Sequence, residues 1–163
     1  RAYPMGDKRR IALYLMNNIL GGPGMNARLN LSLRERHALV YTVESFITSY
    51  GDTGLWGLYF GCDPHDTSRC LRLVRKELDR FMKQPLTDTQ LKAAKRQIKG
   101  QIGVACDSRE SFALDFAKTF LHYGLEKDVT SLFSQLDDVT ATDIQLVAQD
   151  IFKEECITRM IIN

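Results

Sequence analysis

Apolar residues recur every three to four positions through most of the chain, which predicts a largely helical protein. Within residues 8–20, Ile11, Leu15 and Ile19 share one face, and Gly21 with Gly22 then ends the helix. The same spacing predicts further helices over about 26–37, 66–83, 109–123, 128–136 and 140–152.

Capping signals refine two of these helix starts. Thr87 and Gln90 have the spacing of a capping box, in which each side chain bonds the other's free amide, and they begin a long helix that runs to about residue 105. Thr142 is a plausible cap for the helix over 140–152.

Three segments have the alternating, β-branched and aromatic character of strands. Residues 41–50 and 55–62 flank a Gly51–Gly54 turn and predict an antiparallel hairpin, and Ile157–Ile162 predicts a strand near the end of the chain. The fold class is therefore α+β, with two layers in which helices pack on one face of a mostly antiparallel mixed sheet. Three strands are few for so many helices, so either a first strand lies upstream of Arg1 or residues 1–6 supply a stub of one.

Composition sets the broad class. The 163 residues suffice for one domain with a real core, and 44% hydrophobic and 26% charged residues are ordinary globular values. The net charge of +2, with Lys and Arg spread over several helices, argues against nucleic acid as a partner. No apolar run reaches membrane-spanning length, which predicts a soluble protein, either cytoplasmic or exported. Because the chain begins with Arg1 and carries no leader, we expect a single domain cut from a longer protein.

Several familiar catalytic patterns are missing from the sequence. Gly22–Ala27 fits a variant dinucleotide fingerprint, but it follows a predicted helix rather than a strand. His37, His65 and His122 are too far apart for a helical zinc motif, and no serine lies in a nucleophile elbow. The four cysteines have no metal-binding spacing, and we expect buried free thiols. The four cysteines are Cys62, Cys70, Cys106 and Cys156.

Arg34 and Tyr41 are the candidate catalytic residues. A guanidinium and a phenol are fixed hydrogen-bond donors, and these two lie at the end of one predicted helix and the start of the next strand. Converging on one oxygen, they could stabilise the oxyanion of a tetrahedral intermediate. The alternative is that Arg34 pairs with a surface carboxylate while Tyr41 packs on the sheet.

The ordered set of motifs resembles the pitrilysin/insulinase family of zinc metallopeptidases, which includes mitochondrial processing peptidase and the core proteins of respiratory complex III. The resemblance rests on Leu20–Gly22, Ser32–Arg36, Leu39–Tyr41, Tyr50–Gly54 and Leu58–Gly61, and on the later segments Leu91–Gly103 and Thr140–Ile144. It covers nearly the whole chain.

The resemblance implies a role for the chain within a larger enzyme. Family members pair a domain that carries H-x-x-E-H and zinc with a homologous domain that lacks the zinc ligands and supplies an Arg and a Tyr with six residues between them. Arg34 and Tyr41 have that spacing, and the zinc motif is absent. The implied assignment is the C-terminal, non-zinc domain, inactive alone, which forms half of the cleft and holds an extended peptide. Zinc is expected in the partner domain, on the same chain or another subunit.

A second function remains open beside this one. The chain could be a catalytically inactive scaffold or partner subunit, like the core proteins of complex III. The sequence indicates neither the substrate, the compartment nor the oligomeric state.

Overall fold

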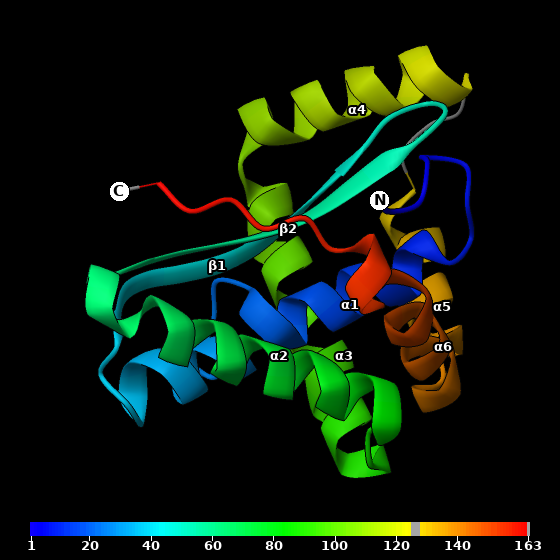
Figure 1. Cartoon of the computed structure of the whole chain (residues 1–163). Helices are drawn as coiled ribbons and strands as arrows, with labels where there is room; N and C mark the ends of the chain where they lie inside the picture. Colours follow the sequence, from blue (N-terminus) through cyan, green and yellow to red (C-terminus); the bar gives the residue numbers. More distant parts are fainter. Residues whose placement is uncertain (125–127, 163) are drawn as a thin grey trace.

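The computed structural model describes residues 1–124 and 128–162 and shows a β-hairpin covered on one face by helices (Figure 1). The predicted α+β class is confirmed. In chain order the elements are α1 Arg10–Gly21, η1 Asn30–Glu35, β1 Val40–Ser49, β2 Gly54–Cys62, η2 Pro64–Asp66, α2 Thr67–Lys83, α3 Asp88–Asp107, α4 Arg109–Tyr123, α5 Val129–Asp138, α6 Ala141–Ile151 and η3 Glu154–Cys156.

The sheet consists of β1 and β2, paired antiparallel from Ser49 opposite Gly54 to Val40 opposite Cys62. It is antiparallel throughout the described residues, not mixed. An isolated bridge between Ala2 and Gly54 extends it, so residues 1–6 do supply the expected stub of a strand. The pairing of β1 with β2 shifts register between Val40 and Thr42, at Tyr41.

Ile157–Ile162 is not a strand, and the sequence prediction was wrong there. The segment makes no ladder hydrogen bonds, and Met160, Ile161 and Ile162 are exposed. Its composition favours a strand, but a strand also needs a neighbour for its backbone groups. In the part of the chain that the structure describes, β1 and β2 pair only with each other and with the stub.

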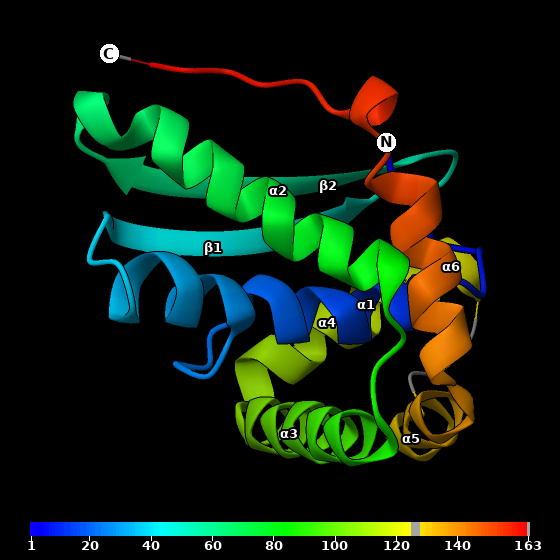
Figure 2. The ribbon, with the colours of Figure 1, turned by 60° about the horizontal axis from the view of Figure 1, so that its bottom comes forward.

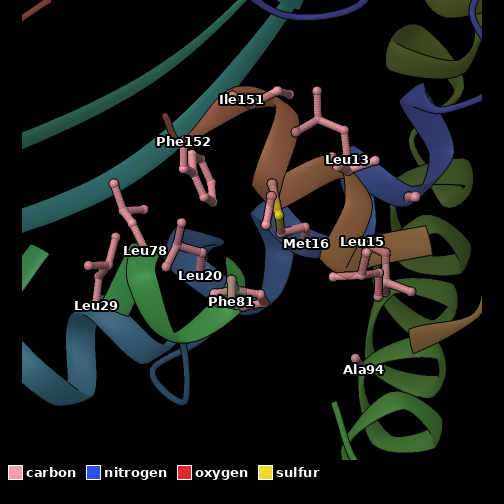
Figure 3. Packing of buried hydrophobic residues seen from close by; sticks show 14 of the residues in the cluster. Leu13, Leu15, Met16, Leu20, Leu29, Leu78, Phe81, Ala94, Ile151 and Phe152 are labelled. Carbon is pink, nitrogen blue, oxygen red and sulfur yellow. The ribbon is translucent and has the colours of Figure 1, made fainter. Parts of the chain in front are cut away.

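Helix α1 is the centre of the molecule. The hairpin lies over one side of it and α3 lies on the other (Figure 2). The side chains of Leu13, Leu15, Met16 and Leu20 are completely buried, and Figure 3 shows them meeting residues from the other helices. Those partners include Leu29, Leu78, Phe81, Ala94, Ile151 and Phe152.

Capping explains where two of the later helices begin. The predicted Thr87–Gln90 box is present at α3. At α6 the cap is Thr140 rather than Thr142, because the Asp143 side chain accepts from the Thr140 N–H while the Thr140 hydroxyl accepts from the Asp143 N–H. The Thr140 hydroxyl also donates to the Asp143 carboxylate, and this bond, together with the one from the Thr140 N–H, holds the pKa of Asp143 below its usual value. No described helix is both long and apolar enough to cross a bilayer.

The hairpin approaches α1 so closely that one position has no room for a side chain. A Cβ on Gly21 would lie 2.6 Å from Ser45 Oγ and 2.9 Å from the Ser45 backbone nitrogen. Contacts this short involve the backbone of β1, so a side chain at Gly21 would push the hairpin away from α1. The end of α1 and the middle of β1 are therefore fixed relative to each other.

We expect Gly21→Ala to lower the free energy of unfolding by about 1–3 kcal/mol, because the added methyl overpacks this contact. Gly103→Ala is the matched control, since Gly103 lies in α3 with nothing within 4 Å of the added Cβ. It should raise stability by about 0.8 kcal/mol through helix propensity. Urea unfolding followed by circular dichroism measures both, and equal stabilities would contradict the close approach.

Candidate functional site

A hollow of about 370 Å³ lies between the end of α1 and the first half of β1, and we call it the β1 groove. Arg34 and Tyr41 both line it, so the structure brings the two predicted residues to one place. The remaining lining residues are Tyr14, Asn17, Asn18, Gly21, Gly22, Pro23, Gly24, Met25, Asn30, Thr42, Val43, Glu44, Ser45 and Ile98.

The glycine loop forms one wall of the groove. It follows α1, as the sequence indicated, and the Gly22 N–H closes that helix by donating to the Asn18 carbonyl. Asn26 then donates to Gln97 of α3 at 2.8 Å, and Asn18 donates to Gln101 at 2.6 Å. The loop and the helix end are thus anchored on α3. The glycines therefore end α1 and turn the chain. A dinucleotide-binding glycine loop follows a strand, and this loop follows a helix, as the sequence predicted.

Arg34 lies in an unusual turn that the sequence did not reveal. The predicted helix over 26–37 contains a π-helix at Asn30–Glu35, in which the Arg36 N–H donates to the Leu31 carbonyl. Short π segments occur often at functional sites. His37 Nδ1 lies 2.6 Å from the Ser32 carbonyl oxygen near the end of this π-helix.

Ala38 stands between Arg34 and Tyr41 in the left-handed region, with φ of 49°. Its N–H donates to the Arg34 carbonyl at 2.9 Å, and the chain then reverses into β1. An alanine in this conformation costs about 1 kcal/mol, and such residues concentrate at functional sites. No pattern in the sequence points to this residue, because alanine favours helices and carries no turn signal.

Among the residues that the structure describes, the Arg34 guanidinium has one marginal ionic partner. Its Nε lies 4.0 Å from a carboxylate oxygen of Glu35, and both side chains are about half exposed. Such a pair is weak in water. The guanidinium donors are therefore accessible to a ligand in the groove. Arg34 is not firmly paired with its carboxylate neighbour, Glu35.

Tyr41 does not pack on the sheet, since 72% of its surface is exposed. Its hydroxyl donates to Asp63 Oδ1 at 2.7 Å, which joins the start of β1 to the residue after β2. This hydrogen bond, together with the negative charge of Asp63, raises the pKa of Tyr41. Asp63 is a site residue that sequence reasoning missed, because only the strand register brings it to Tyr41.

One unpaired edge of the sheet runs beside the groove. The sheet order is β1–β2, so the other side of β1 has no strand neighbour among the described residues. The groove is lined there by Tyr41 to Ser45 of β1. An extended peptide could add to such an edge through backbone hydrogen bonds.

Asp63, His65 and Asp66 form the one cluster of possible metal ligands in the described ranges, with ligand atoms within 4.8 Å of one another. The cluster lies at the surface, Asp63 accepts from Tyr41, and His65 Nε2 is 3.2 Å from Asp66. Exposed acidic groups of this kind are common without an ion, and a catalytic zinc site usually has three protein ligands in a protected cleft. These residues do not fit a peptidase zinc centre.

The cysteines are all free thiols, as expected, but they are not all buried. Cys70 is completely buried, and that burial raises its pKa to about 11. Cys156 is exposed, so the expectation of burial was wrong there. Its position in the short turn η3, beyond the end of α6, explains the difference.

Comparisons with known proteins identify relatives. Residues 1–98 match the family described as peptidase M16 inactive domain. An uncharacterised zinc protease of Streptomyces coelicolor is 32% identical over 145 residues, which cover 89% of this chain and 31% of that protein. The mitochondrial-processing peptidase β subunit of Pongo abelii is 31% identical over 144 residues, which cover 84% of this chain and 29% of the subunit.

The fold has matches among solved structures as well. A chain of complex III2 from Candida albicans superposes with a TM-score of 0.78 at 18% identity, covering 91% of this chain and 37% of that one. At this identity the match concerns the fold alone. The chain therefore spans about a third of the length of the proteins it matches.

The Tyr41–Asp63 hydrogen bond can be tested by titration. Asp63→Asn removes the charged acceptor that stabilises the protonated phenol, so the pKa of Tyr41 should fall toward the ordinary tyrosine value. NMR of tyrosine labelled at Cζ would measure it. Asp52→Asn, in the hairpin turn, is the control and should leave Tyr41 unchanged. An unaltered Tyr41 titration in Asp63→Asn would show that the bond is not formed in solution.

Proposed function

Because the chain belongs to the family of peptidase M16 inactive domains, we propose that it is the C-terminal, non-zinc domain of a longer zinc-dependent endopeptidase. In this proposal it forms half of the cleft, and a homologous zinc-bearing domain on the same chain or another subunit forms the other half. The zinc protease and the processing-peptidase subunit among its relatives support this assignment. Alone, the chain is expected to hydrolyse nothing.

The observation that carries the proposal is the position of Arg34 and Tyr41 in one groove beside an open strand edge. An extended peptide lying along β1 would bond to the strand through its backbone. Its carbonyl groups would then pass the two donor side chains. The groove is therefore suited to bind a peptide backbone rather than one particular side chain.

Arg34 and Tyr41 would have two tasks on such a peptide. Their N–H and O–H groups hold the substrate carbonyl in the bound state, and they stabilise its oxygen as negative charge develops during hydrolysis. Tyr41 has a single proton, which it donates to Asp63 in this structure. Substrate binding would exchange that hydrogen bond for one to the carbonyl oxygen.

The metal belongs to the other half of the proposed enzyme. Among the described residues the three histidines do not come together in a metal site, and the Asp63–His65–Asp66 cluster does not have the ligand set of a peptidase zinc. Zinc held by the partner domain would activate the attacking water. The residues of this chain would position the peptide opposite it.

We expect Arg34→Ala and Tyr41→Phe in the intact peptidase each to lower kcat/KM for a peptide substrate about 100-fold or more, as loss of an oxyanion donor does. Arg36→Ala and Tyr50→Phe are the matched controls, because both residues are exposed and neither lines the groove. Undiminished cleavage by the Arg34 and Tyr41 variants would remove their assigned role.

The alternative function is an inactive scaffold or partner subunit. The fold that the chain shares with a complex III chain is compatible with it, but the pair of donors in one groove favours the peptidase. An H-x-x-E-H motif in the polypeptide that carries this chain, or in an adjacent gene, supports the peptidase. If the motif is absent from both, the scaffold becomes the better explanation.

A further inference from the structure

A second hollow, of about 500 Å³, lies on the outer side of α2, away from the β1 groove, and its lining is strongly basic. Arg72, Lys76, Arg80 and Lys83 line it in sequence along the helix, and Arg159 reaches it from the C-terminal segment. We call it the α2 groove. Its other lining residues are Leu71, Arg75, Asp79 and Gln84.

The carboxylates near this groove are already paired. Arg75 Nε donates to Asp79 Oδ1 at 2.7 Å, and its Nη1 lies 3.3 Å from Glu154, which also contacts Arg159. Arg75 further donates to the Phe152 carbonyl at 2.8 Å, so this network holds the C-terminal segment against α2. In the described ranges, no ion pair involves Arg72, Lys76, Arg80 or Lys83.

A further cation, Arg28, lies close enough to Arg80 to feel its charge but does not line the groove. Arg28 stacks on the Phe81 ring at 4.3 Å. Its burial lowers its pKa, and the charge of the neighbouring Arg80 lowers it further, while Glu77 opposes this. Glu77 is buried on the inner side of α2, so it does not neutralise the groove.

Folding accounts for only part of this distribution of charge, since Arg80 and Lys83 lie in the last turn of α2, where the helix dipole favours cations, but Arg72 and Lys76 do not. The inner face of α2 needs Val74, Leu78 and Phe81, but the outer face needs only to be polar. Arg72 and Lys76, and again Lys76 and Arg80, are like charges four residues apart, which destabilises a helix by about 0.2–0.5 kcal/mol for each pair. The whole chain has a net charge of only +2, so the concentration is local.

We propose that the α2 groove binds an acidic segment of polypeptide. Its four cations from Arg72 to Lys83 follow one helix face for about 16 Å, at 1.5 Å per residue, which suits a run of Glu or Asp side chains. The groove contains Leu71 and the aliphatic stems of its long side chains, but none of its described lining residues is aromatic. Binding of single-stranded nucleic acid commonly uses aromatic side chains on which bases stack, so an acidic peptide is the better fit.

This site is independent of the proposed function, since the α2 and β1 grooves share no lining residue. It would give the protein a second contact with a substrate or with a protein partner that carries an acidic stretch. The chemistry of the groove specifies the charge of that stretch and not the protein to which it belongs.

Fluorescence anisotropy with a labelled oligo-glutamate peptide tests the proposal on the full chain. Lys76→Gln/Arg80→Gln should weaken binding at least about fivefold, because two charge pairs are lost. Lys92→Gln/Arg96→Gln is the matched control: it removes the same two residue types at the same spacing from the exposed side of α3. We expect it to change the affinity less than twofold.

A second measurement requires no variant. The unmodified protein should bind oligo-glutamate and fail to bind oligo-glutamine of the same length, and added salt should weaken the binding. Equal losses in the two double variants, tighter binding of a single-stranded oligonucleotide than of the acidic peptide, or no preference for glutamate over glutamine would each overturn the proposal.

Discussion

The position of the hairpin on α1 depends on hydrogen bonds made by one residue, Asn17. Its side-chain nitrogen donates to the Ser45 carbonyl of β1 at 3.2 Å, and its side-chain oxygen accepts from Trp56 Nε1 of β2 at 2.9 Å. The Ser45 hydroxyl in turn donates to the Asn17 carbonyl at 3.4 Å. Asn17 lies one helical turn before Gly21, which is itself crowded by Ser45. Because these bonds are partly buried, breaking them would leave polar groups without partners, which is costly. The two walls of the β1 groove therefore have a fixed separation.

The two faces of α2 illustrate how the core and the surface are combined in this domain. Its inner side chains join the cluster around α1, and that packing holds the helix rigid against α6. The outer side chains are then presented on a fixed surface, with the C-terminal segment held beside them by Arg75. The β1 groove, in contrast, combines one cation, Arg34, with the carboxylate of Glu44. The domain thus has two surface grooves of different charge supported by a single core.

Much of the fold could be predicted from local sequence, because helix periodicity, the Thr87–Gln90 box and the hairpin turn act over short distances. The strand prediction for Ile157–Ile162 was wrong, because a strand depends on a partner strand that composition does not reveal. Only part of the candidate site could be predicted. Arg34 and Tyr41 were proposed from their residue types and from the family resemblance, and they line one groove, whereas the contact of Asp63 with Tyr41 needs the strand register and Ala38 needs the backbone conformation. The basic charge of the α2 groove emerges only after the structure shows which carboxylates Arg75 has already paired.

In the proposed function, Arg34 and Tyr41 hold a peptide in the β1 groove, opposite a zinc ion on another domain. A crystal structure of the intact peptidase with an uncleaved peptide, obtained after its zinc-bearing half has been inactivated by mutation, tests this most directly. We expect a peptide extended along β1, with one carbonyl oxygen within hydrogen-bond distance of both side chains and with Tyr41 released from Asp63. A peptide bound in the cleft while Arg34 stays in solvent and Tyr41 keeps its bond to Asp63 would contradict it.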